Sequence, residues 1–367
     1  MKASFSREDT LITKGILIIM LLVHHVFNAA DAMPYDIDTV IGDTELFYDI
    51  TSYCRICIAG FAFLTAYGMT QKFKRMDSDD SASCFVLTIK RLVKLELSIY
   101  IVYVLAVLYK RFIVGQSLQS LYRNEGESVA AMLLHMFIDM TGMSCYTETA
   151  RINITWWYLS YAILLIIAMP FVYFAYKKFR WLLIPAGCLL PHAILNSKVS
   201  FALLLPAVVL GTAFSYEEWF DQLKCRNIRQ MIVRGIISVV LLYIAYLCYI
   251  TTNTVFSYTL AVTIPYIAFQ YISGIPGLNI LLKYIGKHAT NIFLTHTFIY
   301  YYFYPDFIYS FHSFPYILLV LAGTSLCVSI VIELIKKITG YNRLSDRILK
   351  YIDDKAKLLF RKENLHC

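Results

Sequence analysis

Two adjacent histidines near the end of the first apolar run are the residues best suited to chemistry. The run "KGILIIMLLVHHVF" begins at Lys14 and carries His24 and His25 close to its end. In an α-helix, the eleven positions from Lys14 to His25 rise ~16 Å and turn ~20° beyond three full turns. These two side chains therefore share one face, and His24 points about a quarter-turn away. A neutral imidazole at His25 can accept a proton on one nitrogen while a partner holds the other, as a general base requires.

A basic cluster, "IKRLVKLELS", lies at the start of the third apolar run. Arg91 and Lys94 are three positions apart and Lys90 and Lys94 are four apart, so a helix presents them as one basic surface. Arginine binds phosphate through paired hydrogen bonds and lysine binds it as a point charge, which makes this surface a candidate phosphate site. Anchoring of the helix at the membrane boundary explains the same residues equally well. Arg55, inside the second run, needs a partner or a water-filled cavity.

The late segment "GKHATNIFLTH" adds a further pair of histidines. His288 lies near the start of this segment, and His296 follows about two helical turns later. Histidines on helices from both ends of the chain predict a polar centre within a helical bundle. By itself, this pattern also fits a proton-coupled transporter.

The elements that carry these residues must be membrane helices. Hydrophobic residues make up 59% of the 367 residues, charged residues make up 16%, and the mean hydropathy is +0.60. The net charge of +8 comes from short basic clusters beside apolar runs, which indicates membrane topology rather than nucleic-acid binding. Cys54 and Cys57 form an isolated pair without a second pair or a nearby histidine, so we expect no metal site.

We expect an all-α integral membrane protein, a bundle of ten transmembrane helices embedded in the lipid bilayer. The predicted spans lie at about 11–27, 50–71, 84–109, 155–176, 181–196, 199–216, 231–250, 256–273, 288–304 and 315–335. A further run at 128–142 carries His135 and Asp139 and is only about fifteen residues long, so we expect it not to span.

The distribution of basic residues supports this count and predicts that both termini are cytoplasmic. With 128–142 left out, most of the 33 Lys and Arg residues face the cytoplasm. The exceptions are Lys110, Arg111, Arg123, Arg151 and Lys198 on the external side, and Arg55 within a span. Counting 128–142 as a span moves the basic cluster at 177–180 to the external side. We therefore predict one membrane-embedded domain over residues 7–337 and a short basic cytoplasmic tail over 338–367.

The tail has two interpretations. Its apolar residues fall near helical spacing with basic residues between them; they are Leu344, Ile348, Leu349, Ile352, Leu359 and Phe360. This pattern fits a helix that lies on the cytoplasmic membrane surface. A solvated tail without such a helix stays open as the alternative.

Several of these patterns resemble the integral-membrane acyltransferase family 3, whose members modify surface glycans and some small molecules. Lys14, the glycine after it and His25 are similar to the first-span signature, a cation and a histidine eleven positions apart. Arg91-x-x-Lys94 resembles the third-span cation pair. The segment "FAFLTAYGM" resembles the second-span pattern, and "GKHATNIFLTH" resembles the late element that ends in histidine.

A further element of the family, a Trp-x-Leu pattern followed by proline, is similar to Trp157, Leu159 and Pro170. The chain departs from the family at the acid that many members carry within this element, where Ala162 stands, so that role is not carried over. Together the patterns extend over about residues 7–335, nearly the whole chain.

The resemblance implies an O-acyltransferase, an enzyme that transfers groups other than aminoacyl groups, in a bacterial plasma membrane. The implied donor is an acyl-CoA, most often acetyl-CoA, whose phosphates bind near Lys90, Arg91, Lys94 and Lys14. His25 is implied as the base that deprotonates the acceptor or assists acyl relay, with Lys14 and His296 as further catalytic candidates.

The acceptor implied by the resemblance is a hydroxyl of a cell-surface or lipid-linked glycan, or another hydroxyl compound. The expected role is therefore polysaccharide modification, and no nucleic acid is an expected partner.

Two other classes stay open. A multi-span transporter or flippase of a glycan or small solute shows internal repeats and paired helix breaks, and neither is visible here. The second class is a membrane-bound O-acyltransferase of an unrelated type, built around one histidine and one asparagine. Asn291 and His296 could be that pair in this chain, but the first-span motif at Lys14 and His25 argues against this class. Transfer or hydrolysis of acyl-CoA by purified protein distinguishes an acyltransferase from a transporter.

Overall fold

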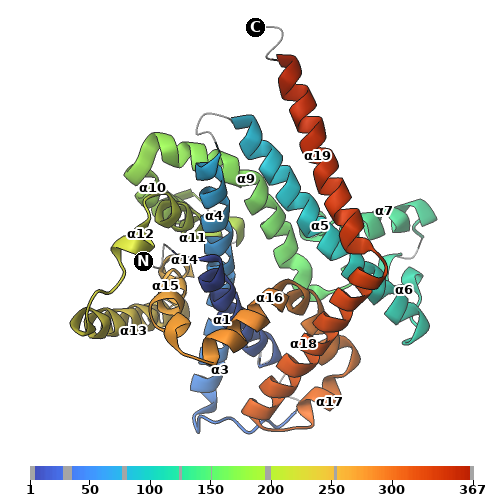
Figure 1. Cartoon of the computed structure of the whole chain (residues 1–367). Helices are drawn as coiled ribbons and strands as arrows, with labels where there is room; N and C mark the ends of the chain where they lie inside the picture. The colour runs from blue at the N-terminus through green and yellow to red at the C-terminus, as the bar shows by residue number, and fades with distance from the viewer. Residues whose placement is uncertain are drawn as a thin grey trace. The chain divides into compact units, whose positions relative to one another are not determined.

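The computed structural model describes residues 5–27, 35–76, 81–123, 126–149, 151–194, 200–251 and 254–363. Within these ranges every element is a helix, so the all-α fold class is confirmed. Figure 1 shows the course of the chain and the helix labels. Residues 364–367 at the end of the predicted tail lie outside the described ranges.

The chain divides into two compact units, each of which is described by itself. Unit 1 comprises residues 1–75 and 171–327, and unit 2 comprises residues 76–170 and 328–367. One division falls at the end of α4 (Cys57–Arg75), and the other two fall inside α9 (Trp157–Phe179) and α18 (Phe314–Ile338). The predicted division into an embedded domain and a tail stays a prediction.

Unit 1 is built around two pairs of long helices. Helix α1 (Arg7–Val26) packs along α16 (Leu278–Thr297), and α4 (Cys57–Arg75) packs along α11 (Ser200–Tyr216). The other elements of this unit are α3 (Thr44–Tyr53), η1 (Cys54–Ile56), η3 (Arg180–Leu182), α10 (Leu183–Ile194), α12 (Trp219–Gln222), α13 (Ile228–Ile250), α14 (Thr254–Leu260), α15 (Thr263–Gln270), η4 (Ile272–Gly274), the π-helix η5 (Phe298–Phe303) and α17 (Pro305–Tyr309).

Seven helical stretches of the described residues are long and apolar enough to cross a membrane. They are Arg7–Val26, Thr44–Arg75, Ser81–Phe112, Ile154–Pro191, Ile228–Ile250, Thr254–Gly274 and Phe314–Ile338. The predicted span 181–196 is largely part of the stretch Ile154–Pro191. The predicted span 199–216 corresponds to α11, which has 17 residues. The predicted span 288–304 begins on α16, whose polar residues lower its hydropathy. The count of ten spans and the orientation of the termini stay predictions.

The N-terminal helix α1 begins at a capping box that its sequence encodes. The backbone N–H of Asp9 donates to Ser6 Oγ at 3.2 Å, and the backbone N–H of Ser6 donates to Asp9 Oδ2 at 2.9 Å. This reciprocal pair satisfies backbone donors that the first turn of a helix leaves free. The start of the helix, and with it the register that ends in His24 and His25, is therefore fixed locally.

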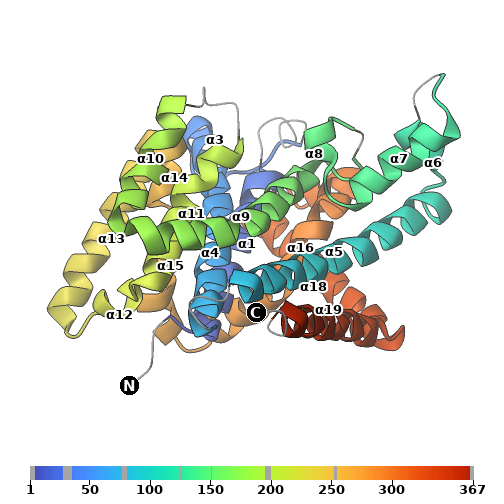
Figure 2. The same ribbon diagram turned by 90° about the horizontal axis from the view of Figure 1, so that it is seen from above.

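Helices α1 and α16 cross at a point where both carry glycine. A Cβ atom on Gly15 would overlap the main-chain carbonyl of Leu282, and a Cβ on Gly286 would overlap the main-chain carbonyl of Leu11. Small residues at a crossing let two membrane helices approach with their backbones in contact. Figure 2 shows the two helices side by side.

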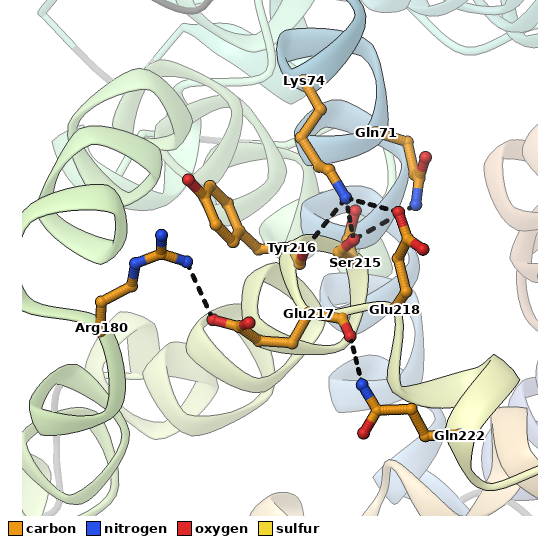
Figure 3. A network of polar contacts seen from close by, with 8 residues as sticks. All are labelled: Gln71, Lys74, Arg180, Ser215, Tyr216, Glu217, Glu218 and Gln222. Carbon is orange, nitrogen blue, oxygen red and sulfur yellow. Dashed lines mark hydrogen bonds and ion pairs between the residues drawn. The ribbon is translucent and has the colours of Figure 1, made fainter.

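A polar joint holds the ends of α4 and α11 together (Figure 3). The Lys74 ammonium donates to the carbonyls of Ser215 and Tyr216 at 3.2 and 2.9 Å and pairs with Glu218 at 3.0 Å. A cation suits this place because the last carbonyls of a helix lack intrahelical partners and carry partial negative charge. Arg180 forms a second ion pair of the joint, with Glu217 at 3.2 Å. We assign these residues a structural role in unit 1.

Unit 2 contains the longest helix and an amphipathic helix that lies against it. Helix α5 (Ser81–Phe112) has 32 residues, and α19 (Tyr341–Glu363) packs beside it. The tail predicted at 338–367 is therefore helical over Tyr341–Glu363. The smaller elements of this unit are α6 (Leu118–Tyr122), α7 (Val129–Met140), α8 (Ser144–Thr147) and η2 (Ile154–Trp156).

The predicted non-spanning run 128–142 corresponds to α7. This helix has 12 residues, about 18 Å, which is shorter than a bilayer core. Its buried Asp139 accepts hydrogen bonds from Tyr122 Oη at 2.5 Å and from the Ile152 backbone N–H at 2.7 Å. His135 Nδ1 lies 3.2 Å from the Tyr122 carbonyl. Both polar residues of the run thus have partners within the segment 122–152 of unit 2.

Candidate functional site

Three histidine rings meet in unit 1. The ring of His25 lies between its neighbour His24 and the distant His296, with centroid separations of 5.0 and 5.1 Å. His24 and His25 belong to the end of α1, and His296 belongs to the end of α16. The polar centre predicted from histidines at both ends of the chain is therefore present, and two of the three predicted catalytic residues belong to it.

The meeting of His25 and His296 follows from the glycine crossing. His25 lies ten positions after Gly15, and His296 lies ten positions after Gly286. Ten helical residues rise ~15 Å, so two parallel helices in contact at the glycines bring these rings to the same level. The glycine of the first-span signature thus sets the distance between the two helices that carry the histidines.

The ring of His296 is held by the backbone of its own helix. Its Nδ1 lies 3.0 Å from the carbonyl oxygen of Ile292 and 2.9 Å from that of Phe293. Because carbonyl oxygens only accept hydrogen bonds, we assign the proton of the neutral ring to Nδ1. Nε2 is then the acceptor nitrogen, and it lies 3.3 Å from the Thr297 hydroxyl. His296 is fully buried, and its tautomer is set by these contacts.

The ring of His24 is held from the neighbouring helix α3. Its Nδ1 lies 3.3 Å from the Thr51 carbonyl oxygen, so Nδ1 is again the donor. The Thr51 hydroxyl in turn donates to the carbonyls of Phe27 and Tyr48, at 3.3 and 3.1 Å. These contacts join the end of α1 to α3 and give His24 a fixed structural partner.

His25 differs from both neighbours. Its side chain is partly exposed, and among the described residues no hydrogen-bond partner of its ring is found. It is flanked by two rings whose tautomers are fixed. Of the three histidines, His25 therefore has the ring nitrogens best placed to exchange a proton with a substrate.

Arg55 is a further residue of this site, and the predicted site residues do not include it. It lies in η1, which packs against α1, and it is close enough to both His24 and His25 for its charge to act on their rings. Its position four residues after Thr51 places it one helical turn beyond the carbonyl that holds His24. The signal in the sequence was a single arginine inside an apolar run.

Lys14 is partly exposed and lies on α1 beside the glycine crossing. The rise of ~16 Å between Lys14 and His25 along the helix means that the two side chains cannot contact the same reacting atom. Lys14 can contact only a distant part of a long substrate. His288, eight positions before His296, is likewise outside the group of three rings, and its ring contacts that of Tyr284 at a tilt, with 5.0 Å between centroids.

The predicted phosphate-binding residues lie on α5 in unit 2. Arg91 and Lys94 are exposed, whereas Lys90 is half-buried and pairs with Asp353 of α19 at 2.5 Å. A phosphate bound at Lys90 therefore competes with Asp353 for the ammonium group. The structure describes this cluster within unit 2 and the three histidines within unit 1.

Comparison with known proteins yields one family. The sequence profile of a family described as an acyltransferase domain (Acyl_transf_3) matches residues 12–334. This range includes the histidine group, Lys14, Arg55 and the basic cluster on α5. No curated protein and no solved structure matches the chain.

Proposed function

Because the chain belongs to the integral-membrane acyltransferase family 3, we propose that it transfers an acyl group from acyl-CoA to a hydroxyl, with His25 as the base. The match covers nearly the whole chain, and the apolar helices agree with an integral, multi-pass membrane acyltransferase. The observation that carries the proposal further is the pairing of the His25 and His296 rings, 5.1 Å apart, at the ends of two crossing helices.

The residues of unit 1 supply the parts that acyl transfer needs. His25 accepts the proton of the acceptor hydroxyl as its oxygen forms a bond to the thioester carbonyl carbon. The carbonyl oxygen then carries negative charge, which a nearby fixed cation stabilises, and Arg55 is the cation close to His25. Collapse of this tetrahedral intermediate breaks the carbon–sulfur bond, and the proton on His25 passes to the departing thiolate.

His296 acts on His25 rather than on the substrate in this scheme. Its Nδ1 proton is committed to the carbonyls of Ile292 and Phe293, so its Nε2 keeps a lone pair. The ring of His296, held in place by these contacts, lies 5.1 Å from that of His25 between centroids and limits the orientations that the His25 ring can adopt. We therefore assign His296 the role of a positioning residue.

The donor and acceptor follow from the family resemblance and the charge pattern. We propose acetyl-CoA as the donor, with its phosphates bound by Arg91, Lys94 and Lys90 after Lys90 leaves Asp353. The exposure of Arg91 and Lys94 supports this role. The proposed acceptor is a hydroxyl of a cell-surface or lipid-linked glycan, and the proposed location is a bacterial plasma membrane.

The test replaces His25 by glutamine, which keeps a polar side chain of similar size and removes the titrating nitrogen. Purified protein in lipid nanodiscs is supplied with labelled acetyl-CoA and a panel of glycan acceptors, and labelled product is measured. We expect His25→Gln to lower turnover by about 10²–10⁴-fold, the usual contribution of a general base.

His24→Gln is the matched control, because it changes the adjacent ring and removes only a packing and hydrogen-bond contact. Such contacts contribute about 0.6–2 kcal/mol between membrane helices, so a modest loss of stability with turnover retained is expected. Near-normal turnover of His25→Gln would show that a hydrogen-bonding side chain suffices and that the assignment of the base is wrong. Absence of acyl transfer by the unmodified protein with every donor and acceptor would argue against the proposed function itself.

A further inference from the structure

Helix α19 exposes a narrow apolar stripe on one side. Leu344, Tyr351 and Leu358 are 50%, 61% and 57% exposed. They are seven residues apart, and seven residues fall only ~20° short of two full helical turns. The three side chains therefore form one continuous line along the helix, on a surface that none of the described residues covers.

Basic side chains lie between the members of this stripe. Arg347 is three positions after Leu344 and four before Tyr351, and Lys355 is four after Tyr351 and three before Leu358. Residues with these spacings are neighbours on a helix surface. The Lys355 ammonium lies 5.5 Å from the centroid of the Tyr351 ring, so its chain extends along the stripe. The exposed Asp354, three positions after Tyr351 and four before Leu358, lies on the same edge as Arg347. The exposed face is thus apolar along its centre, and its edges carry Arg347, Lys355 and one carboxylate.

The side of α19 that adjoins this stripe is already occupied. Tyr341 Oη donates to the Leu97 carbonyl of α5 at 2.6 Å, and Asp353 pairs with Lys90 of α5 at 2.5 Å. Ile348 and Ile352 are half-buried on this side. Figure 1 shows α19 running beside α5. The contact with α5 fixes the rotation of α19, so the apolar stripe faces away from unit 2 in a defined direction.

The chain connection places the start of α19 at a membrane surface. The preceding helix α18 is one of the stretches that can span a membrane, and it ends with Lys336, Lys337 and Ile338. Only Thr339 and Gly340 separate Ile338 from the first residue of α19, and Gly340 adopts a positive φ of 71° that turns the chain. Three residue steps span at most ~11 Å. The stripe therefore begins within the headgroup region next to the end of α18.

From these observations we propose that α19 binds the surface of an anionic membrane, with Leu344, Tyr351 and Leu358 inserted among the lipids. Arg347, Lys350 and Lys355 then contact the negatively charged headgroups. A helix with an apolar line and an excess of exposed cations suits this environment. A second copy of α19 fits less well, because exposed cations outnumber exposed carboxylates on this helix and two copies therefore repel each other. Over residues 341–358 the exposed cations are Arg343, Arg347, Lys350, Lys355 and Lys357, and the exposed carboxylates are Asp346 and Asp354. This inference concerns lipid recognition and does not depend on the reaction proposed above.

The test places a photoreactive residue in the stripe of the full-length protein. Leu358→p-benzoylphenylalanine is irradiated in nanodiscs that mix phosphatidylcholine and phosphatidylglycerol, and adducts are identified by mass spectrometry. We expect lipid adducts enriched in phosphatidylglycerol above its share of the bilayer. The same substitution at Asp346, an exposed position on the other side of the helix, should give few lipid adducts.

A triple variant tests the role of the cations. Replacing Arg347, Lys350 and Lys355 by glutamine keeps good helix formers and removes three positive charges. We expect the phosphatidylglycerol enrichment to fall to the bulk ratio, while hydrogen exchange shows that α19 remains helical. High salt should also lower the phosphatidylglycerol enrichment, because it screens the attraction between the cations and the headgroups.

Three results would overturn the inference. Lipid adducts at the bulk composition while Arg347, Lys350 and Lys355 are in place would show insertion without recognition of charge. Crosslinks between two copies of the chain in place of lipid adducts would assign the stripe to self-association. Equal lipid labelling at positions 346 and 358 would show that the stripe is not the face in contact with lipid.

Discussion

The contrast among the three histidines is a matter of individual hydrogen bonds. His24 and His296 each commit one nitrogen to a main-chain carbonyl, whereas no described residue holds the ring of His25. A general base must be oriented by its surroundings and still present a nitrogen to the substrate. The helical-face argument selected His25 from the sequence. The tautomers of its neighbours could not be predicted, because they depend on where distant carbonyls lie.

Arg55 is the residue whose role the structure changes most. The sequence showed a cation in an apolar run, and the structure places its charge within electrostatic range of His24 and His25. We expect Arg55→Gln to lower kcat by about 10²–10³-fold, as removal of one oxyanion-stabilising group does, with a much smaller change in the KM for acyl-CoA. Arg55→Lys should restore part of kcat because it keeps the charge and loses the fork geometry.

Steady-state kinetics of the two Arg55 variants in nanodiscs measures this separation. Arg111→Gln is a suitable control, because this exposed arginine lies in the last turn of α5 and far along the sequence from the histidines. A different result would contradict this role. If both Arg55 variants lower the melting temperature by the same amount and the folded fraction keeps its kcat, Arg55 only stabilises the fold.

At the scale of helices, the site depends on the crossing of α1 and α16. The residues at the crossing, Gly15 and Gly286, belong to segments that resemble the family's first and late elements. The sequence showed these glycines without a reason for them. Their reason is the close approach of two backbones separated by about 270 positions in the chain, a relation that no local pattern encodes. By contrast, the helical character of α1 was predictable because its capping box and apolar run are local.

We expect Gly286→Ala to separate α1 from α16 and to abolish acyl transfer. The added methyl group overlaps the Leu11 carbonyl and crowds the backbone N of Gly15, both of which are main chain and cannot move aside. Overpacking of this kind costs about 1–3 kcal/mol. The variant should show a lower melting temperature in a thermal-shift assay and a larger loss of turnover than of protein yield.

Gly68→Ala provides the matched control, since Gly68 lies in α4 and a Cβ there meets no atom within 4 Å. This change should be neutral or slightly stabilising, because alanine is the better helix former. Equal melting temperatures and equal activities for Gly286→Ala and Gly68→Ala would mean that the crossing does not set the distance between the histidines.

At the scale of the whole molecule, composition predicted the class correctly and left the number of spans unresolved. The fold is all helical, and seven stretches of the described residues meet the length and apolarity of a span. The difference from ten arises where the simple rule fails. Helix α16 carries Lys287, Asn291 and His296, and these polar residues lower the hydropathy of a 20-residue helix that is otherwise long enough to span. Polar residues reduce the hydropathy of a helix even where the bundle buries them.

The last prediction concerns the side of the membrane on which the segment around α7 lies. Helix α7 is about 18 Å long and its Asp139 and His135 bond within the segment 122–152, so we expect both ends of α7 on the external side. Cysteines introduced at Gln116 and Thr147, in a background without other reactive cysteines, should both react with a membrane-impermeant maleimide added to intact cells. A cysteine at Lys350 of α19 should react only after the cells are opened, because the distribution of basic residues places the C-terminal tail in the cytoplasm. Protection of the cysteine at 147 in intact cells, with labelling only after opening, would make α7 a span and reverse the orientation of every helix after it.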